Sequence, residues 1–227
     1  MKAGSGHRTR TAQTLPAALL LLSLAAETAA ASEVLWRIEA GLGAAHSFGS
    51  MLAIQQDGSP RIELEANWEA RSLEAPVYYA WRVSRWSGGR AWALRFIHHK
   101  LYLANPTPEI ERFSLSHGLN LLTAERGWDV AGWWLWAGLG VVIAHPESTV
   151  RGLQRAEDRG GPLGGGYFVT GPAAALAAAW RRPLGRRAGL VLEARSVVSR
   201  ARVPIASGAA SVRNASLHLS CALDVGF

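Results

Sequence analysis

Apolar and polar side chains alternate one by one at the end of the chain. From 217 to 227 the odd positions are Leu, Leu, Cys, Leu, Val and Phe, whereas the even positions are His, Ser, Ala, Asp and Gly. A period of two is that of a β-strand, because successive side chains point to opposite faces. A run of about 11 residues is also the length of a tilted strand that spans a bilayer. The pattern therefore predicts a strand with one apolar face, which we expect to touch lipid.

The same alternation recurs in several earlier segments. It is clearest at 34–43, 61–69, 77–84, 92–97 and 113–121. In a soluble protein the apolar positions would face a core, whereas in a membrane barrel they face lipid and the polar positions face the lumen. Tryptophans near the predicted strand ends, such as Trp68, Trp86, Trp92 and Trp128, are typical of an interfacial girdle.

Counting these segments predicts an all-β fold, a transmembrane antiparallel up-and-down β-barrel. Ten strands are expected, at 34–45, 50–56, 61–70, 77–86, 91–103, 110–122, 129–144, 166–181, 188–201 and 212–227. The number is even, as in single-chain bacterial barrels. Short turns at 87–90, 123–128 and 182–187 would lie at one end, and the long loop 145–165 at the other. If the chain only kinks near Gly58, eight strands are the alternative.

The first 31 residues have the pattern of a cleavable signal peptide. Lys2, Arg8 and Arg10 precede a short apolar run at 15–26, and three alanines at 29–31 offer a cleavage site. The apolar run is too short for a spanning helix. We therefore expect export, with 1–31 as signal peptide and 32–227 as one barrel domain.

Composition narrows the picture only slightly. The net charge is +7, but the arginines are scattered and form no basic helix, so no nucleic-acid partner is expected. Cys221 is alone, which excludes an intramolecular disulfide. The most apolar stretch after the signal, 130–144, is shorter than a membrane-spanning helix. No cofactor is indicated by any motif.

The hairpin at 87–90 predicts charged side chains inside the barrel. Pairing across this turn places Arg82 opposite Arg95, and a centred turn at 71–76 would place Glu65 opposite Arg82. Two neighbouring arginines need carboxylates close by, and Glu63 is also available. We therefore expect a lumen ionic network of Glu63, Glu65, Arg82 and Arg95. Glu69 is also available, with Glu39 and Glu193 as further candidates.

A second hairpin, around 104–109, is rich in serine and histidine. If Leu103 pairs with Ile110, His99 lies opposite Ser114 inside the barrel. Because His98 would point to the other face, these adjacent histidines cannot chelate one metal ion from a regular strand. No metal site is therefore expected.

Four residues of this hairpin are candidates for catalysis. His99, Ser114, Ser116 and His117 could form a serine–histidine–acid site with a rim carboxylate. The candidate acids are Glu109, Glu111 and Glu147, and His145 is a spare histidine. The other interpretation is a polar lumen wall, because any lumen face alternates polar with apolar residues.

The signal peptide, the alternating strands and the terminal Phe227 together resemble the small outer-membrane β-barrels of Gram-negative bacteria. The stretch 97–121 and the His145-Pro146-Glu147 segment look like an uncharacterised barrel family. The resemblance implies the cell outer membrane as location and Phe227 as the insertion signal. It implies two partners, the barrel-assembly machinery and outer-membrane lipid such as lipopolysaccharide.

Two functions follow from this resemblance. The first is a barrel with a structural or interaction role and a largely filled polar lumen. The alternative is a lipid A acyl-chain-modifying enzyme, a deacylase or acyltransferase, because some outer-membrane barrels use histidine, serine and acidic residues near the rim. Whether the chain is an enzyme is left open. A diffusion channel is less favoured, because side chains largely fill so narrow a lumen.

Overall fold

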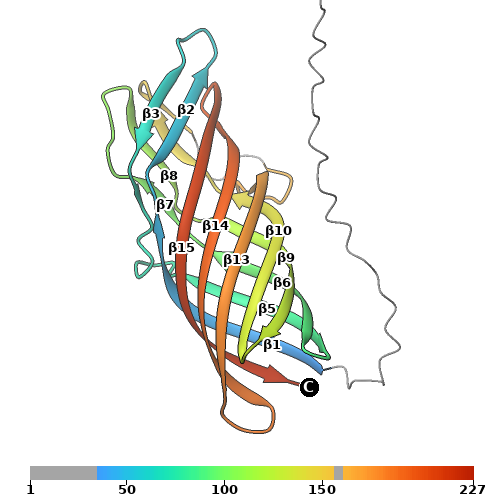
Figure 1. The fold of residues 1–227 in the computed structure, drawn as a ribbon. Coiled ribbons are helices and arrows are strands. Elements are labelled where there is room, and N and C mark those ends of the chain that lie inside the picture. Colours follow the sequence, from blue (N-terminus) through green and yellow to red (C-terminus); the bar gives the residue numbers. More distant parts are fainter. Residues whose placement is uncertain (1–34, 156–160) are drawn as a thin grey trace, which may run out of the picture. The chain divides into compact units, whose positions relative to one another are not determined.

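The computed structural model describes residues 35–155 and 161–227 (Figure 1). The expected signal peptide at 1–31 lies outside the described residues. In the described part, the regular elements are all β-strands, and there is no helix long and apolar enough to cross a membrane.

The described residues form fifteen strands, of which the last three are the longest. They are β1 (Leu35–Ser47), β2 (Ser50–Gln56), β3 (Ile62–Ala66), β4 (Trp68–Glu69), β5 (Tyr79–Ser87), β6 (Arg90–His98), β7 (Leu101–Leu103), β8 (Ile110–Leu115), β9 (Leu119–Val130), β10 (Trp133–Ala144), β11 (Glu147–Val150), β12 (Leu153–Gln154), β13 (Phe168–Pro183), β14 (Ala188–Ile205) and β15 (Gly208–Gly226).

Eight of these strands close into an antiparallel ring. Their order is β1-β5-β6-β9-β10-β13-β14-β15, and β15 pairs back onto β1, with Ile38 opposite Val225. Closure leaves no free edge in the ring, so every ring strand has a neighbour on both sides. The expected up-and-down antiparallel barrel is confirmed. Its strand number is the alternative of eight, and not ten.

Three tight turns lie at the end of the ring where β1 begins and β15 ends, which we call the turn end. The predicted turn at 87–90 is confirmed, because Gly88 and Gly89 have positive φ and Trp86 pairs with Ala91. The predicted turn at 123–128 is wrong. Strand β9 continues to Val130, and the chain turns at Ala131 and Gly132, which have φ of 52° and 83°. Alanine rarely adopts positive φ, so the sequence did not mark this turn.

At the opposite end the chain builds a second structure, which we call the cap. Strand β2 pairs with the first residues of β15, β3 pairs with β2, and β4, β7, β8, β11 and β12 form a separate five-stranded sheet. The predicted strands at 50–56 and 61–70 therefore belong to the cap. The chain turns between them near Gly58. The resulting hairpin lies outside the ring, so the ring has eight strands instead of ten.

The cap is built around a hydrophobic core, which continues into the adjoining part of the ring through residues such as Ile97, Leu121 and Val142. Apolar side chains from both sheets are almost fully buried together, including Leu52, Ile54, Leu101, Ile110, Phe113, Leu115, Val203 and Val212. The amide of Gln56 also donates to the carbonyl of Val150, 3.3 Å away, across the two sheets. The cap is thus packed as a water-soluble domain is, with apolar side chains inside.

The two long strands β14 and β15 run through both regions, and their faces exchange polarity on the way. In the ring part of β14, Glu193 and Arg195 are buried inside and Leu192 is exposed outside. In the cap part, Val203 is buried inside and Arg202 is exposed outside. The alternation of inward and outward positions continues unbroken, but the polar face becomes the outer face beyond Val198.

Candidate functional site

The lumen of the ring holds a charge-balanced ionic network. Three arginines and three glutamates point inward and are all at most 6% exposed: Glu39, Arg82, Arg95, Glu125, Glu193 and Arg195. They come from β1, β5, β6, β9 and β14, so the network joins walls that lie far apart in the sequence. Opposite charges in equal number allow such a group to be buried without a net charge.

Several contacts join each carboxylate of this network to more than one arginine. Arg82 donates from Nη1 to Glu39 at 2.9 Å, and it also pairs with Glu193. Arg95 lies 3.1 Å from Glu193 and also pairs with Glu39. Because each acid is shared, removal of one arginine would leave carboxylates buried without full compensation.

Arg195 and Glu125 complete the network on the opposite wall. The Nη1 atom of Arg195 donates to Glu125 at 2.7 Å, and its Nε atom donates to Glu193 at 2.9 Å. The Thr123 hydroxyl donates to Glu125 at 2.8 Å. These hydrogen bonds join buried side chains across the middle of the lumen.

The structure places the four predicted network residues in two different regions. Arg82 and Arg95 lie opposite each other, both buried in the lumen. Glu63 and Glu65 lie instead on β3 of the cap, with exposed side chains. The predicted pairing of Glu65 with Arg82 is wrong, because the strand beside β5 is β1, which brings Glu39 opposite Arg82.

Four members of the network are absent from the predicted set of Glu63, Glu65, Arg82 and Arg95. Glu39 and Glu193, the further candidates, do lie in the network, whereas Glu125 and Arg195 were not singled out. Glu125 lies within the segment that was expected to be a turn, so its inward position was hidden. The register of β9 against β10, with Glu125 opposite Gly138, was needed to see it.

Nearer the turn end a smaller ionic group closes the lumen. Asp224 accepts from Arg181 at 3.0 Å and also pairs with Arg37. Beside it the aromatic rings of Trp86, Trp134 and Trp136 pack against one another. Ionic and aromatic side chains therefore line the lumen from the middle of the ring to the turn end.

The predicted meeting of His99 with Ser114 does not occur. Leu101 pairs with Leu115 and Tyr102 with Ser114, so the register differs from the one expected. His99 lies in the connection between β6 and β7, is buried, and has Nε2 3.0 Å from the Ser47 hydroxyl. Burial lowers the pKa of this imidazole to about 3, so it stays neutral.

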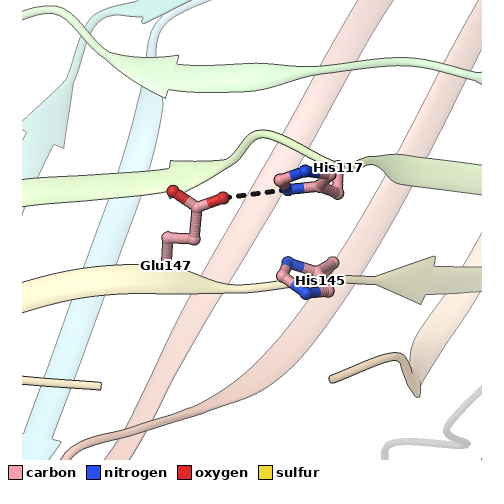
Figure 2. A group of neighbouring side chains, drawn as sticks. All are labelled: His117, His145 and Glu147. Carbon is pink, nitrogen blue, oxygen red and sulfur yellow. Dashed lines mark hydrogen bonds and ion pairs between the residues drawn. The ribbon is translucent and has the colours of Figure 1, made fainter. Parts of the chain in front are cut away.

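Ser116 and His117 do come together, beside Glu147. Figure 2 shows His117 on one segment and Glu147 on the neighbouring one, with Nδ1 of the histidine 3.0 Å from Oε1 of the glutamate. Ser116 donates to the same carboxylate oxygen, and its hydroxyl lies 3.2 Å from the same Nδ1 atom. In a serine–histidine–acid relay the serine and the acid use different ring nitrogens. The relay is therefore not assembled here, and the enzymatic alternative stays a prediction.

His145 completes this cluster at the junction of the ring and the cap. Its ring centroid lies 4.8 Å from that of His117 and 5.0 Å from that of Tyr167. The backbone amide of His145 donates to the carbonyl of Gly118 at 3.1 Å, which holds the two connections side by side. The sequence offered one signal for this grouping, the spacing of His145 and Glu147 two residues apart on one face of an extended segment.

Comparison with known proteins returns similarity in fold only. No protein-family model matches the sequence, and no curated protein matches it. Among solved structures, the chain is similar to Neisserial surface protein A, with a TM-score of 0.41, 10% identity and coverage of 87% of this chain and 99% of that one. The eight-stranded ring is established by the strand pairing of this chain itself.

Two further structures are similar at the same level. Ail, the attachment invasion locus protein of Yersinia pestis, has a TM-score of 0.39 and 10% identity, with coverage of 86% and 99%. The outer membrane protein OprG of Pseudomonas aeruginosa has a TM-score of 0.38 and 11% identity, with coverage of 87% and 96%.

Proposed function

We propose that this chain is an integral outer-membrane β-barrel with a structural or interaction role. The ring lies in the bilayer, and the cap stands outside the cell as the interaction surface. One observation carries the proposal: from its middle to the turn end the ring is apolar outside and ionic inside, while the cap is apolar inside. That contrast is expected only if the two regions are surrounded by different solvents.

The outer wall of the ring exposes leucines on several sides. Leu42, Leu139, Leu176 and Leu219 on four different strands are each at least 60% exposed. Soluble monomers rarely expose contiguous apolar surface on this scale. Lipid chains would cover it without any further protein.

Strand lengths and tryptophans support the same placement. Strands β9 and β10 have 12 residues each, close to the roughly 9–11 that a tilted strand needs to cross a bilayer. Exposed tryptophans gather near the turn end on four strands: Trp36, Trp92, Trp128 and Trp133. Indole rings favour the interface between lipid and water, so this end would lie at the periplasmic surface.

Two partners follow from this placement. Arg200, Arg202 and Arg213 are exposed on the outer face just beyond the apolar wall, with Arg200 and Arg213 directly opposite each other. Guanidinium groups in that position suit the phosphates of outer-membrane lipid such as lipopolysaccharide. Strand β15, which ends beside Phe227 and closes the ring, is the segment that the barrel-assembly machinery would recognise during insertion.

Epitope tags in two turns test the orientation directly. A tag inserted after Gly58, at the tip of the cap hairpin, should be labelled by antibody on intact cells. The matched control, a tag after Gly185 at the turn end, should be labelled only after the outer membrane is permeabilised. Both tagged proteins should shift on a gel when they are heated. Recovery of the chain in the soluble periplasmic extract, or the reverse labelling pattern, would contradict the proposal.

A further inference from the structure

The histidine and glutamate cluster between ring and cap has the composition of a metal site. We propose that His117, His145 and Glu147 bind one divalent transition-metal ion of the zinc class. One ligand atom from each residue lies within 4.8 Å of the others. Figure 2 shows the three side chains projecting into the same space from two neighbouring segments.

Backbone geometry holds these three residues together. His145 and Glu147 flank Pro146, two positions apart, at the start of β11. Glu147 pairs with Ser114 of β8, and the amide of His145 donates to the carbonyl of Gly118 next to His117. The ligands thus come from two connections that the fold itself fixes side by side, the arrangement that a preformed metal site requires.

His145 supplies the second and independent observation. This residue is only 3% exposed, and its Nδ1 atom is buried with no hydrogen-bond partner among the described residues. A buried polar atom without a partner destabilises the folded chain. Coordination of a cation by Nδ1 would give this atom the partner that packing alone does not provide.

The donor set selects the class of metal. Two imidazole nitrogens and one carboxylate oxygen are typical of zinc and its transition-metal neighbours, whereas calcium and magnesium prefer oxygen ligands alone. Three protein ligands leave one coordination position for water, and the His117 side chain is half exposed, so solvent reaches that position. A bound ion at this place would be accessible and not enclosed.

The carboxylate already has neighbours that a metal must accommodate. Arg112 pairs with Oε2 of Glu147, and Ser116 donates to Oε1. The Arg112 side chain is 54% exposed, whereas that of Glu147 is only 5% exposed, so Arg112 approaches the buried carboxylate from the solvent side. Arg112 can therefore remain on Oε2 and orient the carboxylate while Oε1 turns to the metal.

Closing the site requires a small movement. Bond lengths of about 2.0–2.1 Å in a tetrahedral zinc site bring ligand atoms to about 3.3 Å from one another, so the widest pair must approach by about 1.5 Å. The half-exposed His117, followed by Gly118 with φ of 130°, is the ligand best able to move. Metal binding would then fasten the β8–β9 connection to the β10–β11 connection, and so the cap to the ring.

Metal titration of the purified full-length barrel in detergent tests this inference. The chain should carry no histidine tag and should be treated with chelator first. Cobalt(II) should bind with one equivalent per chain and give the visible absorption of a tetrahedral site, and zinc should displace it. His117→Ala should weaken cobalt binding by at least about tenfold. Loss of a residue that only orients a ligand already lowers metal affinity by about 10–100-fold, and loss of a ligand should cost no less.

His117→Ala is the decisive variant, because this side chain is half exposed and its loss should leave the fold intact. Glu147→Gln should weaken binding as well, through the loss of the anionic oxygen. His46→Ala is the matched control, since His46 is exposed on β1 away from the cluster and its loss should leave cobalt binding unchanged. Equal affinity in the wild-type and His117→Ala chains, or no cobalt spectrum in either, would overturn the assignment.

Discussion

The ring and the cap use the same alternation of side chains in opposite senses. In the ring the inward positions of β14 hold Glu193 and Arg195, while leucine faces out. A few residues further along the same strand, the inward position holds Val203 and arginine faces out. The backbone is continuous and antiparallel throughout, so the difference cannot come from secondary structure. On the proposed placement, it comes from the solvent around each region, which is lipid at the ring and water at the cap.

The two regions are therefore stabilised by different forces. The cap gains free energy by removing apolar side chains from water, as soluble domains do. In the proposed bilayer the ring gains little in this way, because its outer apolar face contacts lipid in place of water. Its stability depends on satisfied backbone hydrogen bonds in a closed sheet and on the charge balance of the lumen network. Substitutions at matched positions should separate these contributions.

The largest effect is expected from the lumen network. Arg82→Met removes a buried cation and leaves Glu39, Glu125 and Glu193 with less compensation. We expect the free energy of unfolding to fall by about 3–5 kcal/mol. Equilibrium guanidinium unfolding of the barrel in lipid vesicles measures this change.

The double variant Arg82→Met/Glu193→Met is the control for charge balance. It leaves Arg95 paired with Glu39 and Arg195 paired with Glu125, so each remaining charge keeps a partner. The double variant should therefore be more stable than Arg82→Met alone. A double variant that is less stable than the single one would show that charge compensation is not what the network provides.

An intermediate effect is expected from a charge on the outer wall. Leu176→Arg places a cation halfway along β13, at a position that is 64% exposed in the structure. In a bilayer this should cost about 2–4 kcal/mol, whereas Val198→Arg, close to the arginine rim, should cost about 0–1 kcal/mol. The same vesicle unfolding assay compares the two. If both variants were neutral, water and not lipid would surround the ring.

Local sequence signals predicted the ring well where contacts are local. The Gly88-Gly89 turn fixed the pairing of β5 with β6, and with it the positions of Arg82 and Arg95. Period-two alternation located most of the ring strands, because each of them has one apolar face and one polar face.

The cap and the composition of the two side-chain clusters depend on pairings between strands, which the sequence of one strand does not reveal. Alternation alone cannot tell a lipid-facing leucine from a core leucine, so the cap hairpin was counted within the ring. Glu39 lies beside Arg82, and Glu147 beside His117, only through pairings between segments distant in the sequence. Alanine is not a residue that indicates a positive φ, so the turn at Ala131 was not predicted. The turn was expected instead at 123–128, the segment that contains Glu125.

The smallest effect gives the closest comparison of the two regions, because it removes one methyl group from each. Ile54 is fully buried in the cap, and Ile38 is 49% exposed on the outer wall of the ring. Ile54→Val should lower the free energy of unfolding by about 0.5–1.5 kcal/mol, since close-packed neighbours cannot fill the space that is left. Ile38→Val should change it by less than about 0.5 kcal/mol, because mobile lipid chains take up the lost volume. Unfolding in vesicles measures both. An equal loss at the two positions would mean that protein, and not lipid, packs against the outside of β1.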